Sequence, residues 1–193
     1  MSVVVLDDFL PTETCSALRH HALAAHYEPW YGPEGTEAVK RACRVTTPLL
    51  TDAIAEAVGE EIAIVHSGFR LDYEDELPHT LVHYDADCGD MAMVLYLNTP
   101  AQCRGRGGTA FWEHKATGLI QVPENMDEYV EAGLRTQGQF LDYWESHTIV
   151  DMRWNRAILY PTRYFHSRWP LTGWGNSPET GRLVCGAFFN LLG

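Results

Sequence analysis

From Glu61 to its end, the chain is divided into many short apolar and β-branched runs by Gly, Pro, Asn or Asp residues. Runs of this length and composition predict β-strands. They cover residues 62–65, 69–73, 80–85, 91–97, 109–112, 149–152, 157–160, 165–169 and 183–189. Parallel strands need crossover connections, usually helical, and no crossover helices lie between most of these runs. The series therefore predicts an antiparallel sandwich or jelly roll rather than a parallel α/β sheet.

Helical patterns precede these strands and interrupt them once. Residues 2–6 predict a short strand, and a helix that begins near Thr12 is expected after it. A second helix is expected at residues 48–58, where apolar residues recur on one face. Segment 124–145 predicts a helical insertion with Asn125 as its N-cap, which either covers the substrate as a lid or packs outside the barrel. We expect a mainly β protein of the α+β class, in which a jelly roll carries N-terminal helices and this insertion.

Length and charge limit the domain count and the partners. The chain has 193 residues, enough for one sizeable core, so we expect a single domain covering residues 1–193. Asp and Glu number 26 against 14 Lys and Arg, which gives a formal net charge of −12. Nucleic acid and anionic membrane surfaces would meet mostly like charge, which argues against both as partners. The N-terminus also lacks the basic region of a signal peptide, and no run approaches the length of a membrane span.

The cysteines indicate the expected compartment. Their number is five, which is odd, and no CxxC pair occurs among them. This pattern predicts neither a disulfide framework nor a thiolate zinc site, so a reducing cytoplasm is the expected location. GxSxG, P-loop and dinucleotide GxGxxG motifs are also absent from the sequence.

The segment TLVHYDAD contains the strongest candidate for a metal site. Side chains alternate along a strand, so His83 and Asp85 should point to the same face. They would supply two ligands of a facial triad, and His166, beside a later apolar strand, is the candidate for the third. Such a triad leaves three positions of an octahedral ion open, as Fe(II) requires to bind an oxoacid together with O2. Zinc is more often held by a tetrahedral set of ligands.

An HxD motif alone also arises by chance in a chain rich in His and Asp. Arg182 strengthens the interpretation, because it begins the last predicted strand, after His166. A guanidinium binds a carboxylate through two parallel hydrogen bonds. An arginine near such a metal site is therefore the expected clamp for the far carboxylate of a dicarboxylic cosubstrate.

In their order, the motifs resemble those of the Fe(II)- and 2-oxoglutarate-dependent dioxygenases, and within them the prolyl 4-hydroxylase-like branch. The similar segments span most of the chain: VVVLDDFLP, HYD, MVLYLN followed by GGTAFW, and FHS followed by GRLV. The resemblance implies a double-stranded β-helix in which His83, Asp85 and His166 bind Fe(II). It also implies that Arg182 binds the C5 carboxylate of 2-oxoglutarate. Tyr73 would add a hydroxyl to the same carboxylate, or else is a core residue.

The activity implied by the resemblance is hydroxylation of an unactivated C–H bond. O2 and 2-oxoglutarate are the cosubstrates, and succinate and CO2 are released. Asp85 stands where the related iron halogenases carry Gly or Ala, so hydroxylation is expected rather than halogenation. Arg182 stands where the animal collagen enzymes usually carry Lys, which argues against collagen-like substrates.

Candidates for substrate contacts lie on or beside the strands that carry the motif. They are Trp112, Arg168 and Trp169, although aromatic residues on jelly-roll strands are also common in the core. Arg168 follows His166 by two residues, so both face the same way if the strand continues. A charge inside the barrel needs an anionic partner. A substrate carboxylate would supply one, which favours a small molecule, an amino acid or a derivative, as the substrate.

Three other functions fit the same sequence. The same chemistry on a peptide or protein side chain would need a groove open at the barrel mouth. A jelly-roll binding protein with an incidental triad would form no succinate. A cupin-like metal enzyme would not bind 2-oxoglutarate, and Arg182 would have no role in it.

Overall fold

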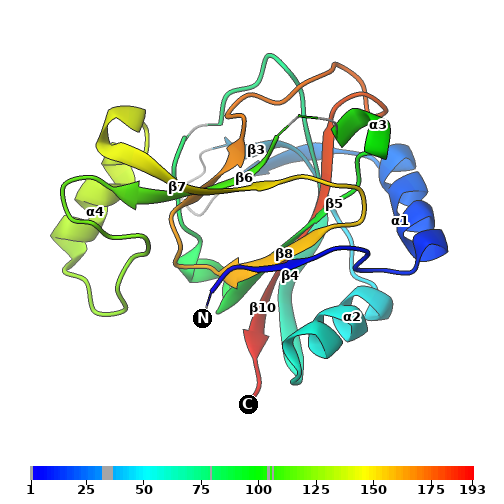
Figure 1. Ribbon diagram of the computed structural model, residues 1–193, viewed down its shortest axis with the longest axis horizontal. Helices are drawn as coiled ribbons and strands as arrows, with labels where there is room; N and C mark the ends of the chain where they lie inside the picture. Colours follow the sequence, from blue (N-terminus) through cyan, green and yellow to red (C-terminus); the bar gives the residue numbers. More distant parts are fainter. Residues whose placement is uncertain (1, 32–36, 79, 104, 106) are drawn as a thin grey trace.

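The computed structural model describes residues 2–31, 37–78, 80–103, 105 and 107–193. Two antiparallel sheets form the centre of the protein (Figure 1). The large sheet has the strand order β1-β8-β5-β10-β4-β3-β2, and the small sheet has the order β7-β6-β9. The strands are β1 (Val4–Leu6), β2 (Glu28–Tyr31), β3 (Glu37–Arg44), β4 (Ile62–Asp72), β5 (Met91–Tyr96), β6 (Gly108–His114), β7 (Trp144–Asp151), β8 (Ala157–Pro161), β9 (His166–Trp169) and β10 (Arg182–Leu191). The expected mainly β jelly roll with few helices is confirmed.

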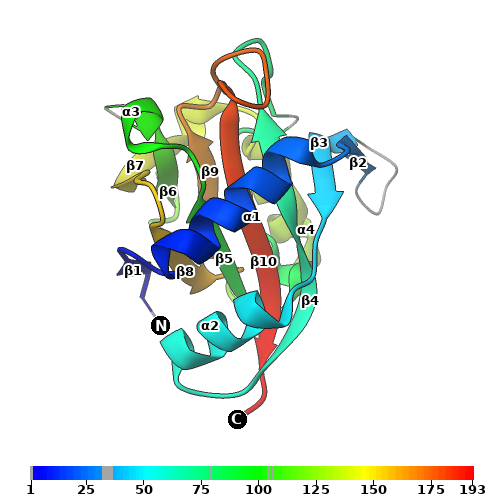
Figure 2. The same ribbon diagram turned by 90° about the vertical axis from the view of Figure 1, so that its right-hand side faces the viewer.

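Helices cover one face of the large sheet, which we call its outer face (Figure 2). The helical elements are α1 (Thr12–Ala24), α2 (Pro48–Val58), α3 (Pro100–Cys103), α4 (Glu128–Gln137) and the short 3-10 turns η1 (Ala86–Cys88) and η2 (Leu141–Tyr143). α1 and α2 bury Ala22 and Ile54 in a core shared with the outer face of the sheet. Gly59 ends α2 with a φ of 79°, a left-handed conformation that glycine adopts without steric cost. Within the described ranges, no helix combines the length and the apolar character needed to cross a membrane.

The central strand β10 separates this outer core from the space between the two sheets. Cys185 and Phe189 belong to the outer core under α1 and α2. Val184 belongs to a second core, between the sheets, to which the small sheet contributes Phe111. Arg182 has the same parity as Val184 and pairs in register with Asp72 of β4. We call this side of the large sheet its inner face.

β4 joins the two strands predicted at residues 62–65 and 69–73 into one. Gly68 lies at the junction, and β3 approaches it so closely that a Cβ atom there would lie 2.6 Å from the carbonyl oxygen of Cys43. β2 and β3 are not predicted by the sequence pattern. β3 carries charged residues along an edge region of the sheet, so it lacks the apolar alternation that marks the other strands.

Residues 80–85, which we call the HxD segment, do not form the predicted strand. His83 makes a single antiparallel bridge with His166 and donates its N–H to the carbonyl of that residue at 3.0 Å. Val82 donates its N–H to the carbonyl of Gly138, and Asp85 donates its own to the carbonyl of Thr162, both at 2.8 Å. The prediction was wrong here because three separate elements, rather than one neighbouring strand, satisfy this backbone.

The helical insertion is shorter than the predicted 124–145. Asp127, not Asn125, caps α4, and its side chain accepts the N–H groups of Tyr129 and Val130 at 3.0 and 3.3 Å. Leu134 is buried in a third core with aromatic residues of the small sheet. α4 therefore packs on the side of the small sheet that faces away from the large one (Figure 1).

The end of the predicted insertion belongs to the small sheet. Trp144 begins β7 and pairs with His114 of β6, although its spacing from Phe140 and Leu141 suggested a continued helix. The Trp144 ring packs on His114 and Phe165, so the apolar residue is buried by strand pairing.

Gly138 accepts a hydrogen bond from Val82 of the HxD segment and packs closely against it. This contact gives a first prediction. A Cβ atom there would lie 2.2 Å from the carbonyl oxygen of Val82, one residue before His83. We expect Gly138→Ala to lower the free energy of unfolding by about 1–3 kcal/mol, as overpacking does, and to weaken metal binding. Gly133 is the matched control, because nothing lies within 4 Å of its Cβ position inside α4.

Urea denaturation and a Mn(II) titration of both variants check this expectation. Gly133→Ala should leave metal affinity unchanged and stabilise the fold by about 0.5–1 kcal/mol, since alanine is the better helix former. Equal effects of the two substitutions would mean that Gly138 does not position the HxD segment.

Candidate metal centre

The structure brings the three predicted ligands together. Ligand atoms of His83, Asp85 and His166 all lie within 4.8 Å of one another, and His166 Nε2 is 3.2 Å from Asp85 Oδ2. No other group of three or more His, Cys, Asp or Glu side chains in the described part of the chain has this geometry. Two imidazoles and one carboxylate thus converge although the HxD segment is not a strand.

Backbone and ring contacts fix the orientation of His166. Its Nδ1 lies 2.9 Å from the carbonyl oxygen of Tyr164, which leaves Nε2 directed toward Asp85. The ring also packs against Tyr160, at 4.9 Å between centroids, and against His83, at 4.4 Å. A second hydrogen bond of this kind is typical of histidines that bind metals, because it fixes the tautomer and the ring.

The protonation states of the site favour a cation. Burial, with the nearby His166, lowers the pKa of His83 to about 3, so its imidazole is neutral near pH 7. Burial would raise the pKa of Asp85, but the hydrogen bond from His166 and the neighbouring charges lower it to about 2. A neutral imidazole and an ionised carboxylate are the forms that bind metal ions.

One buried polar atom without a partner, in His83, indicates whether these residues fit a metal ion. His83 Nδ1 is buried and has no hydrogen-bond partner within the described structure. A buried polar atom without a partner is costly, and sites that bind ions or water are one common reason for it. Two histidines and one carboxylate are the donor set of mononuclear Fe(II) sites, and the set leaves ligand positions open. The residues therefore fit a divalent ion such as Fe(II).

A cluster of arginines around one carboxylate lies at the other end of the inner face. Asp72 is 3% exposed, and its carboxylate is 3.2 Å from Arg182 Nη1 and 3.0 Å from Arg70 Nε. Arg168 Nη1 also donates to this carboxylate. Burial would raise the pKa of Asp72, but the three arginines more than offset it and lower the pKa.

This cluster has capacity for a further anion. Three guanidinium groups share one carboxylate, so two positive charges remain uncompensated within the cluster. Arg182 is buried and donates through Nη2 to the carbonyl of Gly108 at 3.2 Å, but its Nε is buried and has no partner among the described residues. The donor chemistry fits one carboxylate group of a dicarboxylate such as 2-oxoglutarate.

Tyr73 does not lie with Arg182. It has the opposite parity to Asp72 along β4, and its ring packs with the outer core rather than between the sheets. The Arg41 guanidinium lies 4.0 Å from the centre of this ring, and the backbone N–H of Tyr73 donates to Glu76 at 3.0 Å. Its role at the cosubstrate carboxylate remains an untested prediction that these contacts do not support.

Arg168 faces inward as expected, but its anionic partner belongs to the protein. Besides Asp72, its guanidinium donates to the carbonyls of Leu171, at 2.6 Å, and Glu76. Burial lowers the pKa of Arg168 to about 10, so it remains charged near pH 7. All three of its nitrogen atoms are therefore engaged, and the reason for expecting a substrate carboxylate at Arg168 falls away.

Trp112 and Trp169 point away from the metal centre. Both pack in the third core, on the α4 side of the small sheet, with their ring centroids 6.2 Å apart. Trp112 Nε1 donates to the hydroxyl of Ser167 at 2.9 Å. The strand alternation that places Arg168 beside His166 also places Trp169 on the opposite face, so a substrate contact of Trp169 remains a prediction that this placement does not support.

Further residues that surround the centre were not predicted from the sequence. Phe111 pairs in register with His166, and its ring meets Tyr160 edge to face at 5.1 Å. Burial raises the pKa of Tyr160 well above its usual range, so this phenol stays neutral. Asp72 was also missed, because two of its three arginine partners, Arg168 and Arg182, are distant in sequence. Parity with His166 and Arg182 is the signal that would have indicated the inner-face residues.

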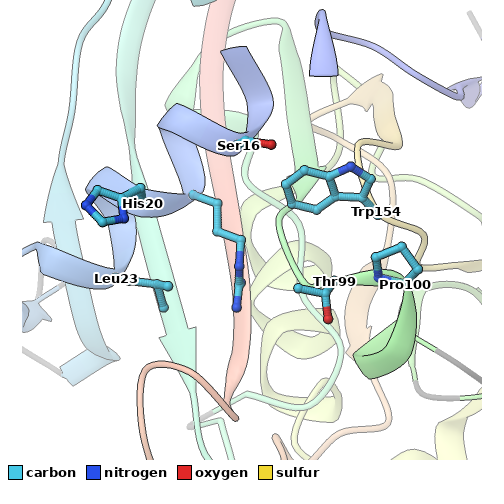
Figure 3. Close-up of a pocket in the computed structure, with 7 residues that line it drawn as sticks. Ser16, His20, Leu23, Thr99, Pro100 and Trp154 are labelled. Atoms are coloured by element: carbon cyan, nitrogen blue, oxygen red, sulfur yellow. The ribbon is translucent and has the colours of Figure 1, made fainter. Parts of the chain in front are cut away.

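A separate hollow of about 380 Å³ lies on the outer side of the large sheet, between α1 and the loop before α3 (Figure 3). Its lining consists of Ser16, Arg19, His20, Leu23, Thr99, Pro100 and Trp154. The Arg19 side chain is partly engaged, because Nη1 donates to the carbonyl of Leu97 at 2.8 Å. The hollow contains no set of metal ligands, and the large sheet separates it from the triad.

The fold is similar to that of solved non-heme α-ketoglutarate-dependent enzymes. The epimerase SnoN from nogalamycin biosynthesis is 18% identical with a TM-score of 0.59, and the match covers 97% of this chain and 77% of that one. The carbocyclase SnoK from the same biosynthesis is 15% identical with a TM-score of 0.60, over 97% and 78% of the two chains. EctD from S. alaskensis, solved with 2-oxoglutarate and 5-hydroxyectoine, is 16% identical with a TM-score of 0.55, over 98% and 72%. At these identities, the similarity establishes the jelly-roll fold.

Sequence comparison adds the family. None of the curated proteins matches the chain. Residues 1–189 match the model of DUF6445, which is described as a family of unknown function. Since that match spans nearly the whole chain, the protein belongs to the DUF6445 family.

Proposed function

We propose that this protein is an Fe(II)- and 2-oxoglutarate-dependent dioxygenase that hydroxylates an unactivated C–H bond of a small molecule. The observation that carries the proposal is the combination of the triad, in which His166 is buried and His83 and Asp85 are partly buried, with the buried Arg182, whose Nε has no partner among the described residues. Both lie between the sheets of a fold that 2-oxoglutarate enzymes share. The prolyl 4-hydroxylase-like branch remains an expectation from the sequence motifs.

The residues of this chain would divide the work as follows. His83, Asp85 and His166 would hold Fe(II), and Arg182 would orient 2-oxoglutarate through its C5 carboxylate. Iron and 2-oxoglutarate, together with O2, would supply the oxidising power, and succinate and CO2 would be released. Phe111 and Tyr160, both buried against the triad, would limit the access of water.

The sequence favoured an amino acid or a derivative as substrate, and related folds include an enzyme solved with 5-hydroxyectoine. We retain a small molecule as the proposed substrate class. Arg168 is engaged by Asp72 and two carbonyls, so a substrate carboxylate would need another partner.

An anaerobic titration tests the cofactor assignment without a substrate. We expect a weak visible absorption when 2-oxoglutarate is added to the Fe(II)-loaded protein. Arg182→Ala should require at least about tenfold more 2-oxoglutarate, because a charge-assisted hydrogen bond is lost. Arg153→Ala is the control, since Arg153 is exposed and pairs with Asp7 at the surface.

The outcomes separate the alternatives. Absorption in wild type and in Arg153→Ala, with a weakened response in Arg182→Ala, supports the assignment. Metal binding without any response to 2-oxoglutarate would favour a cupin-like metal protein. No binding of metal would leave a binding protein in which the triad is incidental.

A further inference from the structure

Two glycines leave part of the inner face without side chains. Gly68 of β4 and Gly186 of β10 are direct partners in the large sheet, and Gly186 also pairs with Val94 of β5. A Cβ atom at Gly186 would meet only the carbonyl oxygen of Met93, at 3.8 Å. Gly68, Gly186 and Val94 are all partly exposed, so solvent reaches this part of the inner face. We call Gly68 and Gly186 the glycine row.

An aromatic surface lies on one side of the glycine row. Phe188 pairs with His66, and their rings stack at 6.5 Å. The ring of Trp30 lies 4.4 Å from that of His66. Phe188 also pairs with Ala92, which in turn pairs with Tyr160, the residue that packs on His166. The aromatic surface is therefore continuous with the metal centre.

Two arginines border the same space. Arg44 pairs with Gly68 and lies 4.6 Å from the centre of the Trp30 ring, and no described acidic side chain pairs with it. Arg70 pairs with Ala42 on the same two strands, which makes it a diagonal neighbour of Arg44. Such neighbours have Cβ atoms roughly 7–8 Å apart, within joint reach of one anion.

Arg70 has capacity for such an anion. Its Nε binds Asp72 at 3.0 Å, its side chain is 29% exposed, and no described residue accepts from its terminal nitrogen atoms. Its charge also acts on the metal centre, where it contributes to the lowered pKa values of His83 and Asp85. Arg70 thus borders both the cosubstrate cluster, through Asp72, and the glycine row, two residues from Gly68 on the same strand face.

The charge balance favours a second anion beside the cosubstrate. Among the described side chains of the inner face, four arginines, Arg44, Arg70, Arg168 and Arg182, face two carboxylates, Asp72 and Asp85. A divalent ion would add two positive charges, and 2-oxoglutarate would remove two. Two positive charges therefore remain although the whole chain has a net charge of −12. Local charge of this sign attracts and orients anionic ligands.

We propose that the substrate is an organic anion whose acidic group binds between Arg44 and Arg70. The apolar part of the substrate lies over the glycine row and against Trp30, His66 and Phe188. In this position the substrate extends toward the triad. This inference rests on the proposed dioxygenase function. A carboxylate and a phosphate would both bind to the two arginines, and the test below distinguishes them.

The test uses three fluorescent probes that share one ring system: 2-naphthoate, 2-naphthyl phosphate and the neutral 2-naphthamide. Fluorescence anisotropy measures their binding to protein saturated with Mn(II) and 2-oxoglutarate. We expect at least one anion to bind about tenfold or more tightly than the amide. Its preference for carboxylate or phosphate identifies the acidic group.

Arg44→Gln is the decisive variant, because Arg44 is exposed and its loss should leave the fold intact. This substitution should weaken the binding of the anion by about tenfold and leave the binding of the amide unchanged. Arg153→Gln removes the same charge at an exposed surface position paired with Asp7, and should change nothing. Gly186→Val should weaken all three probes, because it fills the space over the glycine row.

Three results would overturn the inference: equal binding of anions and amide, unchanged binding in Arg44→Gln, or displacement of the anion by 2-oxoglutarate. Failure of the dioxygenase proposal looks different. In that case the protein would not respond to 2-oxoglutarate, but the probe anion would still bind in a manner that depends on Arg44. That result would support an anion site without oxygenase chemistry.

Discussion

Asp85→Asn is expected to weaken Mn(II) or Fe(II) binding by more than about a hundredfold while the protein stays folded. Substitutions of residues that only support metal ligands already cost roughly 10–100-fold, and Asp85 is itself a proposed ligand. It supplies the only negative charge of the triad. The amide keeps the shape of the side chain, so the change isolates the charge.

Asp87→Asn is the matched control for this substitution. Asp87 lies two residues further on, its side chain is 79% exposed, and its pairing with Arg135 is a surface contact. The same change in net charge should therefore leave metal affinity within about twofold, since exposed pairs contribute little. Calorimetric titration with Mn(II) measures both variants, and equal loss in the two would mean that general charge, not ligation, controls binding.

Asp72→Asn is expected to lower the free energy of unfolding by about 3–5 kcal/mol, the usual cost of removing one partner of a buried ion pair. Asp72 is the common acceptor for Arg70, Arg168 and Arg182. Without its charge, the buried guanidiniums of Arg168 and Arg182 would repel each other without compensation. Urea denaturation checks the value.

The effect should depend on pH in a defined direction. The pKa of Asp72 is lower in the folded protein than its ordinary value of 3.8. Its stabilising contribution is therefore complete above about pH 4 and is lost as the pH falls below 3.8 toward the folded pKa. Wild type and Asp72→Asn should converge in acid. Asp75→Asn, in the exposed loop after β4, should match wild type at every pH.

The strands and the metal ligands could be predicted because both depend on local patterns. Apolar runs separated by turn residues indicate strands wherever they occur, and HxD brings two ligands close by chain connectivity alone. The same patterns failed at residues 80–85, where hydrogen bonds to the carbonyls of Gly138, Thr162 and His166 replace a strand ladder. An apolar pattern indicates that a segment is buried, but it does not specify which groups form hydrogen bonds with the backbone of that segment.

The basic cluster shows what local patterns cannot supply. Arg168 was expected to face inward, and its partner was expected to be a substrate. The partner is Asp72, 96 residues away in the sequence, and no spacing rule connects the two. Tyr73 is adjacent to Asp72, but adjacent residues of a strand face opposite sides, so one lies among the arginines and the other in the outer core.

The hydrogen bond between Val82 and Gly138 makes the insertion part of the machinery of the site. A surface helix that only covers a core can be shortened or exchanged with little effect on distant chemistry. The residue that follows α4 is Gly138, and its carbonyl accepts the hydrogen bond from Val82 in the segment that carries His83 and Asp85. Grafting this insertion, or trimming it, should therefore alter the spacing of the metal ligands, so the insertion and the HxD motif are expected to be transferable only as one unit.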